Sequence, residues 1–310
     1  MKINTYIRLI KWLICGAVCI LGTGVNFIDA VTSTASFMEV GYYPESQGLG
    51  MTGVSHQKGS SSVYWNTGRL GMPDDKSREL STMYYRAFET DFVGVEGLLF
   101  LKKMPIGFSY RQAVISGFLG SGINQDTGRV DLTGESTDYK GRGLIVGTGV
   151  SLTKKVGIGL GLKYIEEDAD VANATGFGAD MGVYFNAHER VKLGMNLQNM
   201  IQPTMTWNTD SKAEETVPLR ARLGSSTYWL NHKLGLHNEV VLENGKSPYG
   251  NWGVGYDFHK YMDINVGLNQ ENISIGLDLK IAPMEVGFSW TKPKREYVTD
   301  YYKFGVKMSL

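Results

Sequence analysis

This sequence contains little cysteine and little proline, and its positive and negative charges balance. Of 310 residues only 2 are cysteine (Cys15 and Cys19) and only 8 are proline. So little proline excludes a collagen-like or proline-rich disordered chain. Lysine plus arginine, 31, equals aspartate plus glutamate, 31. This balance leaves no basic surface of the kind that binds nucleic acid, so no nucleic-acid partner is expected.

The N-terminus has the pattern of a secretory leader. Lys2, Arg8 and Lys11 precede an apolar run over residues 12–21, and small residues follow it. The pattern predicts a signal peptide over residues 1–30, with cleavage near Ala30 or Ala35. The apolar run is shorter than the ~20 residues that a transmembrane helix needs. Both cysteines would leave with the leader, so the mature chain would enter an oxidising compartment without a thiol.

Glycine is abundant, with 39 residues, and much of it recurs at every second position. In the segment 156–164 one face carries Val, Ile, Leu, Leu and Tyr, and the other carries three glycines and Lys163. Segments 191–198, 252–258, 273–281 and 284–290 alternate in the same way. Successive side chains of a strand point to opposite faces, so this period predicts strands with one apolar and one polar or very small face.

Two architectures could bury one face of such strands. A soluble sandwich turns its apolar faces inward, whereas a membrane barrel turns them toward lipid. The expected strands run to about ten residues, which matches a tilted membrane span. Glycine weakens strands of soluble sheets but makes room inside a barrel. Aromatic residues gather near strand ends, where interfacial girdles would lie. The sequence therefore predicts an all-β fold, a transmembrane antiparallel β-barrel of a bacterial cell outer membrane.

About fourteen strands are expected, an even number as single-chain bacterial barrels have. They are predicted near residues 79–88, 92–103, 105–117, 143–153, 156–168, 175–186, 191–204, 217–229, 234–243, 249–258, 262–270, 272–282, 284–293 and 300–310. Short and long connections mostly alternate, as periplasmic turns and extracellular loops do. Charged residues expected to point into the lumen, and to pair there, are Glu96, Lys163, Asp180, Lys192, Glu285 and Lys307. The predicted organisation is a leader over residues 1–30, an N-terminal plug segment over 31–78, and a barrel over 79–310.

The last strand also carries an assembly signal. Residues 303–310 alternate, with apolar residues at the third-last and last positions, Met308 and Leu310. This is similar to the β-signal that the barrel-assembly machinery recognises, with Leu310 in place of the usual terminal phenylalanine. The machinery is therefore an expected partner during biogenesis, and outer-membrane lipid an expected partner afterwards.

Two N-terminal segments resemble a known family. Gly48-Leu49-Gly50-Met51-Thr52-Gly53-Val54 and the stretch from Ser62 to Gly71, with Trp65-Asn66 at its centre, are similar to the N-terminal signature of the PorV/PorQ family of outer-membrane proteins. Segments 176–184, 193–200 and 217–223 resemble later motifs of that family in the same order. The family is related to FadL, the long-chain fatty-acid transporter. The resemblance implies a 14-stranded barrel with its N-terminal segment inside.

The chain departs from that family at several positions. Thr67 stands where the family has proline, Arg69 stands where it has glycine, and residues 56–60 replace an acidic run. These departures put the local geometry and the binding role of the plug in doubt. The plug is either a hatch that gates a hydrophobic ligand or a filler that seals the barrel. Trp65 and Asn66 are the candidate ligand-binding residues.

Catalysis is not expected. Of the five histidines, three fall in predicted turns, and none has the spacing of a metalloprotease helix. A lipid-facing serine–histidine pair, as in an outer-membrane phospholipase, could be imagined for Ser225 or Ser226 with His237, but no motif supports it. No catalytic residue, cofactor or metal site is predicted.

Three functions stay open on the sequence alone. The first is a transport barrel that binds or passes hydrophobic small molecules across the outer membrane. The second is a PorV-like partner of a type IX secretion machine that engages secreted cargo proteins. The third is a purely structural or adhesive barrel. One fold hosts unrelated functions, so the strand pattern does not separate them.

Overall fold

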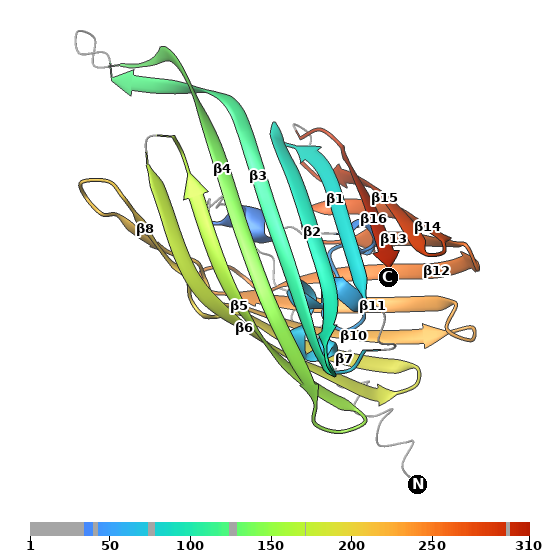
Figure 1. The fold of residues 1–310 in the computed structure, drawn as a ribbon. Coiled ribbons are helices and arrows are strands. Elements are labelled where there is room, and N and C mark those ends of the chain that lie inside the picture. The colour runs from blue at the N-terminus through green and yellow to red at the C-terminus, as the bar shows by residue number, and fades with distance from the viewer. Residues whose placement is uncertain (1–33, 40–42, 74–77, 124–128, 171, 296–297) are drawn as a thin grey trace.

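The computed structural model describes residues 34–310, apart from 40–42, 74–77, 124–128, 171 and 296–297. The predicted signal peptide therefore lies outside the described residues. The main feature is one antiparallel sheet of 16 strands (Figure 1). Fourteen of them close into a barrel, in which β7 pairs with β10 and β1 pairs with β16. The barrel strands are β1 (Glu79–Ala87), β2 (Thr90–Leu101), β3 (Met104–Ile123), β4 (Val130–Ser151), β5 (Val156–Asp168), β6 (Asn173–His188), β7 (Val191–Ile201), β10 (Arg220–Trp229), β11 (Leu234–Glu243), β12 (Tyr249–His259), β13 (Met262–Leu268), β14 (Asn272–Ile281), β15 (Met284–Pro293) and β16 (Tyr301–Ser309).

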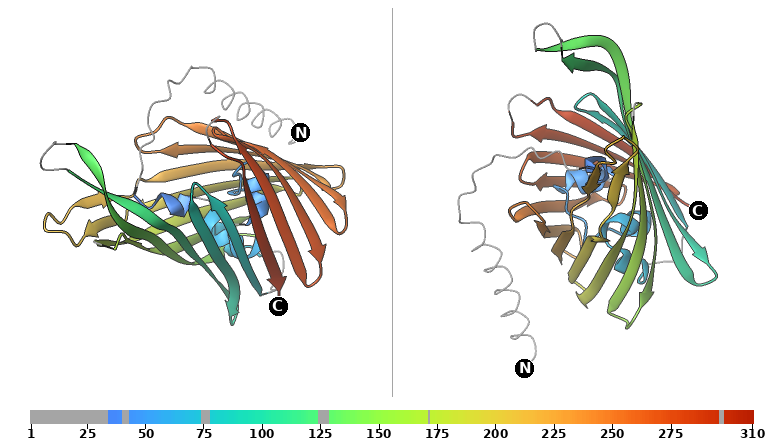
Figure 2. Two further views of the ribbon diagram at one scale, coloured as in Figure 1. Left: turned by 90° about the horizontal axis from the view of Figure 1, so that it is seen from above. Right: turned by 90° about the vertical axis from the view of Figure 1, so that its left-hand side faces the viewer.

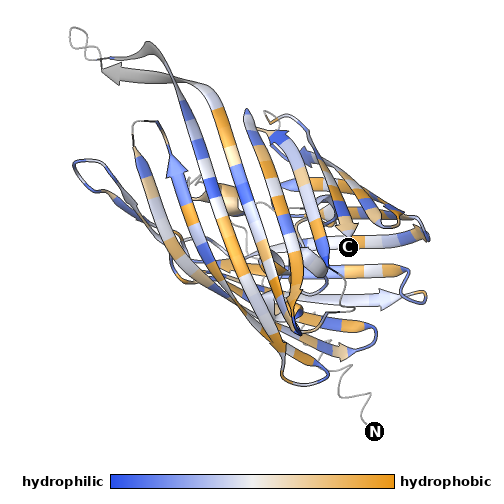
Figure 3. Cartoon of the chain, in the orientation of Figure 1, coloured by the Kyte–Doolittle hydropathy of each residue, from blue (hydrophilic) through white to orange (hydrophobic). Residues whose placement is uncertain are grey.

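The two faces of the barrel wall differ as the sequence predicts. On β5 the side chains of Leu160 and Leu162 face outward and are 55% and 71% exposed. The next residue, Lys163, faces the lumen and is 5% exposed. Figure 3 shows the same alternation of apolar and polar residues along the neighbouring strands. A closed barrel with an outward apolar face satisfies every backbone group without water, as a bilayer requires. The protein is thus a β-barrel of the bacterial outer membrane. Among the described residues, no helix is long and apolar enough to cross a bilayer.

Strand bounds match the sequence prediction closely within the apolar band. The predicted strands 156–168, 234–243 and 284–293 are those of β5, β11 and β15. The prediction is wrong for the hairpin of β3 and β4, which was expected to leave a loop over 118–142. Pairing instead continues to Ile123 and resumes at Val130, with irregular register after Ile115. This part extends beyond the band, where no lipid requires apolar alternation, so the pattern gave no strand signal there.

A second difference lies in the loop expected over residues 205–216. It contains the short strands β8 (Thr204–Trp207) and β9 (Glu214–Thr216). They pair with each other, and β8 also pairs with β6. The loop is therefore a flap attached to the extracellular end of the barrel wall.

The N-terminal segment lies inside the barrel, as predicted, in short helical pieces (Figure 2). These are η1 (Ser36–Glu39), α2 (Pro44–Gly48), η2 (Gly59–Ser61), α3 (Ser62–Trp65) and α4 (Thr67–Leu70). The chain descends from the extracellular half, where η1 lies, to the periplasmic end, where β1 begins at Glu79.

The inward glycines explain how the plug fits. A Cβ atom added to Gly267 would overlap the backbone of Leu49 and Gly50, and one added to Gly194 would overlap Val54. Gly159 makes the same close approach to Thr67. Plug and wall therefore pack backbone against backbone, which only residues without a side chain permit.

Candidate functional site

The lumen carries many polar side chains, and several of its charges are paired. Lys163 binds Asp180 at 2.9 Å and Lys307 binds Glu285 at 3.1 Å. Both are pairs between residues that the sequence predicted to point inward. Arg222 adds a contact to Glu239 at 2.5 Å, and Glu239 also accepts the backbone N–H groups of Gly53 and Val54. Such hydrogen-bonded pairs are what buried charges require.

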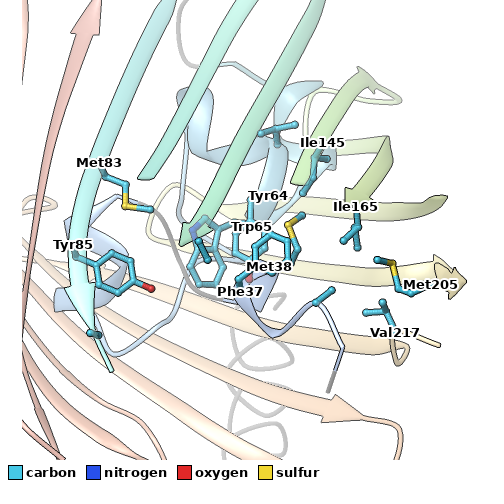
Figure 4. Packing of buried hydrophobic residues seen from close by; sticks show 14 of the residues in the cluster. Phe37, Met38, Tyr64, Trp65, Met83, Tyr85, Ile145, Ile165, Met205 and Val217 are labelled. Atoms are coloured by element: carbon cyan, nitrogen blue, oxygen red, sulfur yellow. The ribbon is translucent and has the colours of Figure 1, made fainter. Parts of the chain in front are cut away.

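One part of the lumen is apolar instead. Buried side chains of the plug and of the wall form a single cluster there (Figure 4). On the plug, Phe37 and Met38 of η1 lie next to Tyr64 and Trp65 of α3. The wall residues of this chamber are Ile145 of β4, Ile165 of β5, Met205 of β8, and Val217. We call these side chains the apolar chamber.

The wall of the apolar chamber is built to receive η1. Inward positions of β4 carry glycine at Gly141 and Gly143, and then isoleucine at Ile145. A Cβ atom at Gly141 would overlap the Phe37 ring, and one at Gly143 would overlap the Met38 side chain. Phe37 and Met38 are 7% and 6% exposed. The two side chains therefore occupy the chamber as an apolar ligand would.

Polar contacts hold η1 in this position. The backbone N–H of Ala35 donates to Glu167 at 2.8 Å, and the Tyr64 hydroxyl donates to the Glu39 carbonyl at 3.1 Å. Arg220 binds the Glu39 carboxylate at 2.6 Å and the Glu243 carboxylate at 2.6 Å. We call these contacts the latch. They join η1 to strands far away in the sequence.

The two predicted ligand-binding residues lie at the centre of the plug. Trp65 is 1% exposed, belongs to the apolar cluster, and has the Arg222 guanidinium 5.0 Å from its ring centre. Asn66 donates to the carbonyls of Val54 and Val183, at 2.8 and 2.9 Å, and accepts from Gly68 N–H as the N-cap of α4. Asn66 therefore fixes the plug to itself and to β6, whereas Trp65 lies against Arg222 of β10. Contact of either with a ligand stays a prediction.

The structure brings Ser226 and His237 together, which sequence spacing did not show. Their Oγ and Nδ1 atoms are 2.8 Å apart because β10 and β11 place them opposite each other. Ser226 also contacts Ser55 of the plug at 2.7 Å and is fully buried. The pair faces the lumen rather than lipid. It joins the plug to the wall.

His56 of the plug lies beside the same pair. Its ring stacks 4.0 Å from the His237 ring, its Nε2 contacts Gln57 at 3.3 Å, and its Nδ1 is buried without a hydrogen-bond partner. Burial lowers the pKa of His56 below its ordinary value of 6.5. Below pH 6.5, His56 would therefore be protonated when the plug is displaced but would stay neutral when the plug is seated.

We expect acidification below pH 6.5 to favour the displaced plug, by up to about tenfold in the equilibrium per pH unit. His56→Gln keeps a hydrogen-bonding side chain but cannot titrate, so its seating should be less sensitive to pH in this window. Conductance of the protein in planar bilayers between pH 7 and 5 measures plug release. Equal pH dependence of wild type and variant would contradict the expectation.

A cavity lies at the opposite, periplasmic end of the lumen, between the plug and the wall. Its volume is about 340 Å³, within the range of small-molecule sites. Apolar lining comes from Leu70, Leu98, Pro283 and Met284, and charged lining from residues that include Lys307. The apolar chamber and this cavity thus lie toward the two ends of the plug.

No family model matches the chain, and no curated protein matches it. Solved structures do. The Pseudomonas putida toluene transporter TodX is similar with a TM-score of 0.62 and 12% identity, over 87% of this chain and 97% of TodX. The Ralstonia pickettii toluene transporter TbuX gives 0.62 and 12%, over 87% of this chain and 98% of TbuX. A Pseudomonas aeruginosa FadL homologue gives 0.55 and 11%, over 87% and 99%.

At these identities the likeness establishes a shared fold, that of the FadL-type barrels. The predicted relation to FadL is confirmed at that level. The narrower resemblance to the PorV/PorQ family has no matching family model and stays a resemblance. None of the three structures is described as a secretion component or an enzyme.

Proposed function

We propose that this protein binds apolar small molecules in the apolar chamber and passes them across the outer membrane. The observation that carries the proposal is the insertion of Phe37 and Met38 into an apolar site inside the barrel. An apolar site filled by a short, latched segment is suited to exchange that segment for a ligand.

The exchange is energetically balanced. Burying side chains such as Phe37 and Met38 contributes about 1.5–3 kcal/mol each. An apolar ligand of similar size regains this free energy when it takes their place. Its binding free energy must also offset the contacts of the latch. Transport of toluene by TodX and TbuX, barrels of the same fold, supports an apolar cargo. The proposed role is that of a channel, without a catalytic step, and outer-membrane lipid surrounds it.

The double variant Phe37→Ala and Met38→Ala tests the proposal. Removing the internal occupant should tighten binding of N-phenyl-1-naphthylamine, an apolar fluorescent probe, by roughly tenfold, because the ligand no longer displaces two buried side chains. Fluorescence titration of the protein purified in detergent measures the affinity.

Phe177→Ala is the matched control, since Phe177 is 71% exposed on the lipid face and its loss should leave the affinity unchanged. Detergent micelles also take up the probe, so only saturable fluorescence that a non-fluorescent aromatic competitor removes counts as binding. An absence of such binding in wild type and double variant alike would sink the proposal.

A further inference from the structure

The apolar packing of the lumen is continuous from the apolar chamber to the periplasmic cavity. Leu70 of α4 and Leu98 of β2 belong to the same buried cluster as Phe37 and Ile145, and they also line the cavity. They are 2% and 4% exposed. The two leucines therefore lie at the boundary between the buried apolar cluster and the periplasmic cavity.

Val63 connects this pair to the chamber. A Cβ atom at Gly107 of β3 would lie 3.0 Å from the Val63 Cβ and 3.3 Å from a Leu70 methyl group. Gly107 is also the direct neighbour of Leu98 across β2 and β3. Val63, Leu70 and Leu98 thus pack around one glycine of the wall.

The plug is fastened to the wall at several points, and one of them, the hydrogen bond from Ser61 to Glu96 of β2 at 2.8 Å, lies two residues from Leu98. On the far side its backbone lies against the inward glycines, and Glu239 holds Gly53 and Val54. Ser55 contacts Ser226 of β10 at 2.7 Å, and Ser60 contacts Ser81 of β1 at 3.1 Å. Each buried hydrogen bond contributes roughly 0.5–1.5 kcal/mol. Moving the whole plug would break all of these contacts, whereas turning two leucine side chains would break none of them.

We infer that apolar cargo leaves the chamber along this seam, with Leu70 and Leu98 as its gate, while the plug stays seated. The inference rests on the proposed function and extends it with an exit route. The cavity beyond the gate, at about 340 Å³, has room for a compact apolar molecule of two or three rings. An engineered apolar cavity of about 150 Å³ holds a single benzene.

Gate variants test the inference in cells. The protein is expressed in a Gram-negative host without its own FadL-type channel, and uptake of N-phenyl-1-naphthylamine is followed by fluorescence. Leu98→Ala should raise the uptake rate several-fold, and Leu98→Trp should lower it at least tenfold by filling the seam. Leu99→Trp, on the lipid face of the same strand and 47% exposed, is the control. Heat-modifiable migration in gels confirms that each barrel is folded.

Engineered disulfides test whether the plug stays seated. The chain's own cysteines, Cys15 and Cys19, lie in the predicted leader, so pairs at Ser55→Cys with Ser226→Cys and at Ser60→Cys with Ser81→Cys can be read without interference. Thiol titration confirms that the bonds form. Oxidised and reduced proteins should take up the probe at rates within about twofold of each other.

Two results would overturn the gate: uptake that oxidation abolishes and reductant restores, or a Leu98→Trp rate equal to wild type. Either leaves the proposed function standing as long as wild-type cells take up the probe faster than cells with an empty vector. Equal uptake by those two strains removes the proposed function and the gate together.

Discussion

Gly267→Leu should turn the sealed barrel into an open pore. Gly267 lies on the lumen side of β13, and the backbone of Leu49 and Gly50 occupies the space that a side chain would need. Gly50 has φ +67 and lies against the backbone of β12 and β13, so this part of the plug cannot make room by a small local shift and has to leave its place. Overpacking costs about 1–3 kcal/mol even where side chains can adjust, and here only backbone is present.

The plug, rather than the wall, should give way, because Gly267 is paired with Gly253 of β12 on one side and with Ser274 of β14 on the other. We expect single-channel conductance in planar bilayers to rise from near zero to that of a water-filled barrel. Val266→Leu, one residue away and 48% exposed on the lipid face, adds similar bulk without touching the plug and should stay closed. A Gly267→Leu barrel that is folded and still closed would show that the plug adjusts instead.

Arg220→Ala should release the N-terminal segment. Arg220 is 5% exposed and lies between the carboxylates of Glu39 and Glu243. Its removal leaves the partly exposed Glu39 and the buried Glu243 without their shared cation, although Lys246 still contacts Glu243 at 2.8 Å. Breaking a buried ion pair by deleting one partner typically costs about 3–5 kcal/mol. Because η1 is short, we expect this cost to be relieved by release of Glu39 rather than by unfolding of the barrel.

Release has a measurable consequence. The segment around Phe37 should become sensitive to added protease in reconstituted vesicles, and probe binding should tighten as it does in the Phe37→Ala and Met38→Ala double variant. Adding Glu39→Gln to Arg220→Ala should recover part of the protection, because a neutral amide is less costly to bury than an unpaired carboxylate. Equal protease resistance of wild type and Arg220→Ala would show that the latch does not hold η1.

The same latch responds to acid. Burial raises the pKa of Glu39, but the charge and hydrogen bond of Arg220 outweigh it and leave the pKa below 4.5. A lowered carboxyl pKa contributes stability above pH 4.5 that is lost as the pH falls below that value. Wild type should therefore approach the protease sensitivity of Arg220→Ala only in strong acid, at lower pH than the window expected for His56.

What the sequence determined by itself is the wall. Within the apolar band the bilayer requires side chains such as Leu160 and Leu162 to face outward. The residues between them, which are glycine or charged, face inward. The sequence therefore alternates with a period of two wherever a strand crosses lipid. For this reason the bounds of β5, β11 and β15 could be predicted from the sequence alone. Beyond the band this requirement ends, and the outer parts of β3 and β4 and the β8–β9 flap left no comparable pattern.

Only the tertiary structure decided the interior. The apolar chamber joins Phe37 to Ile145 and Met205, and the latch joins Glu39 to Arg220. Such contacts depend on which strands the closed barrel sets opposite the plug, and no local spacing encodes that. Sequence marked Trp65 and Asn66 for their motif, whereas barrel closure selected Phe37, Met38, Leu70 and Leu98. The bilayer imposes the same requirement on every strand, so its effect appears as a repeating pattern in the sequence. A single contact across the lumen has no such pattern and depends on the folded barrel.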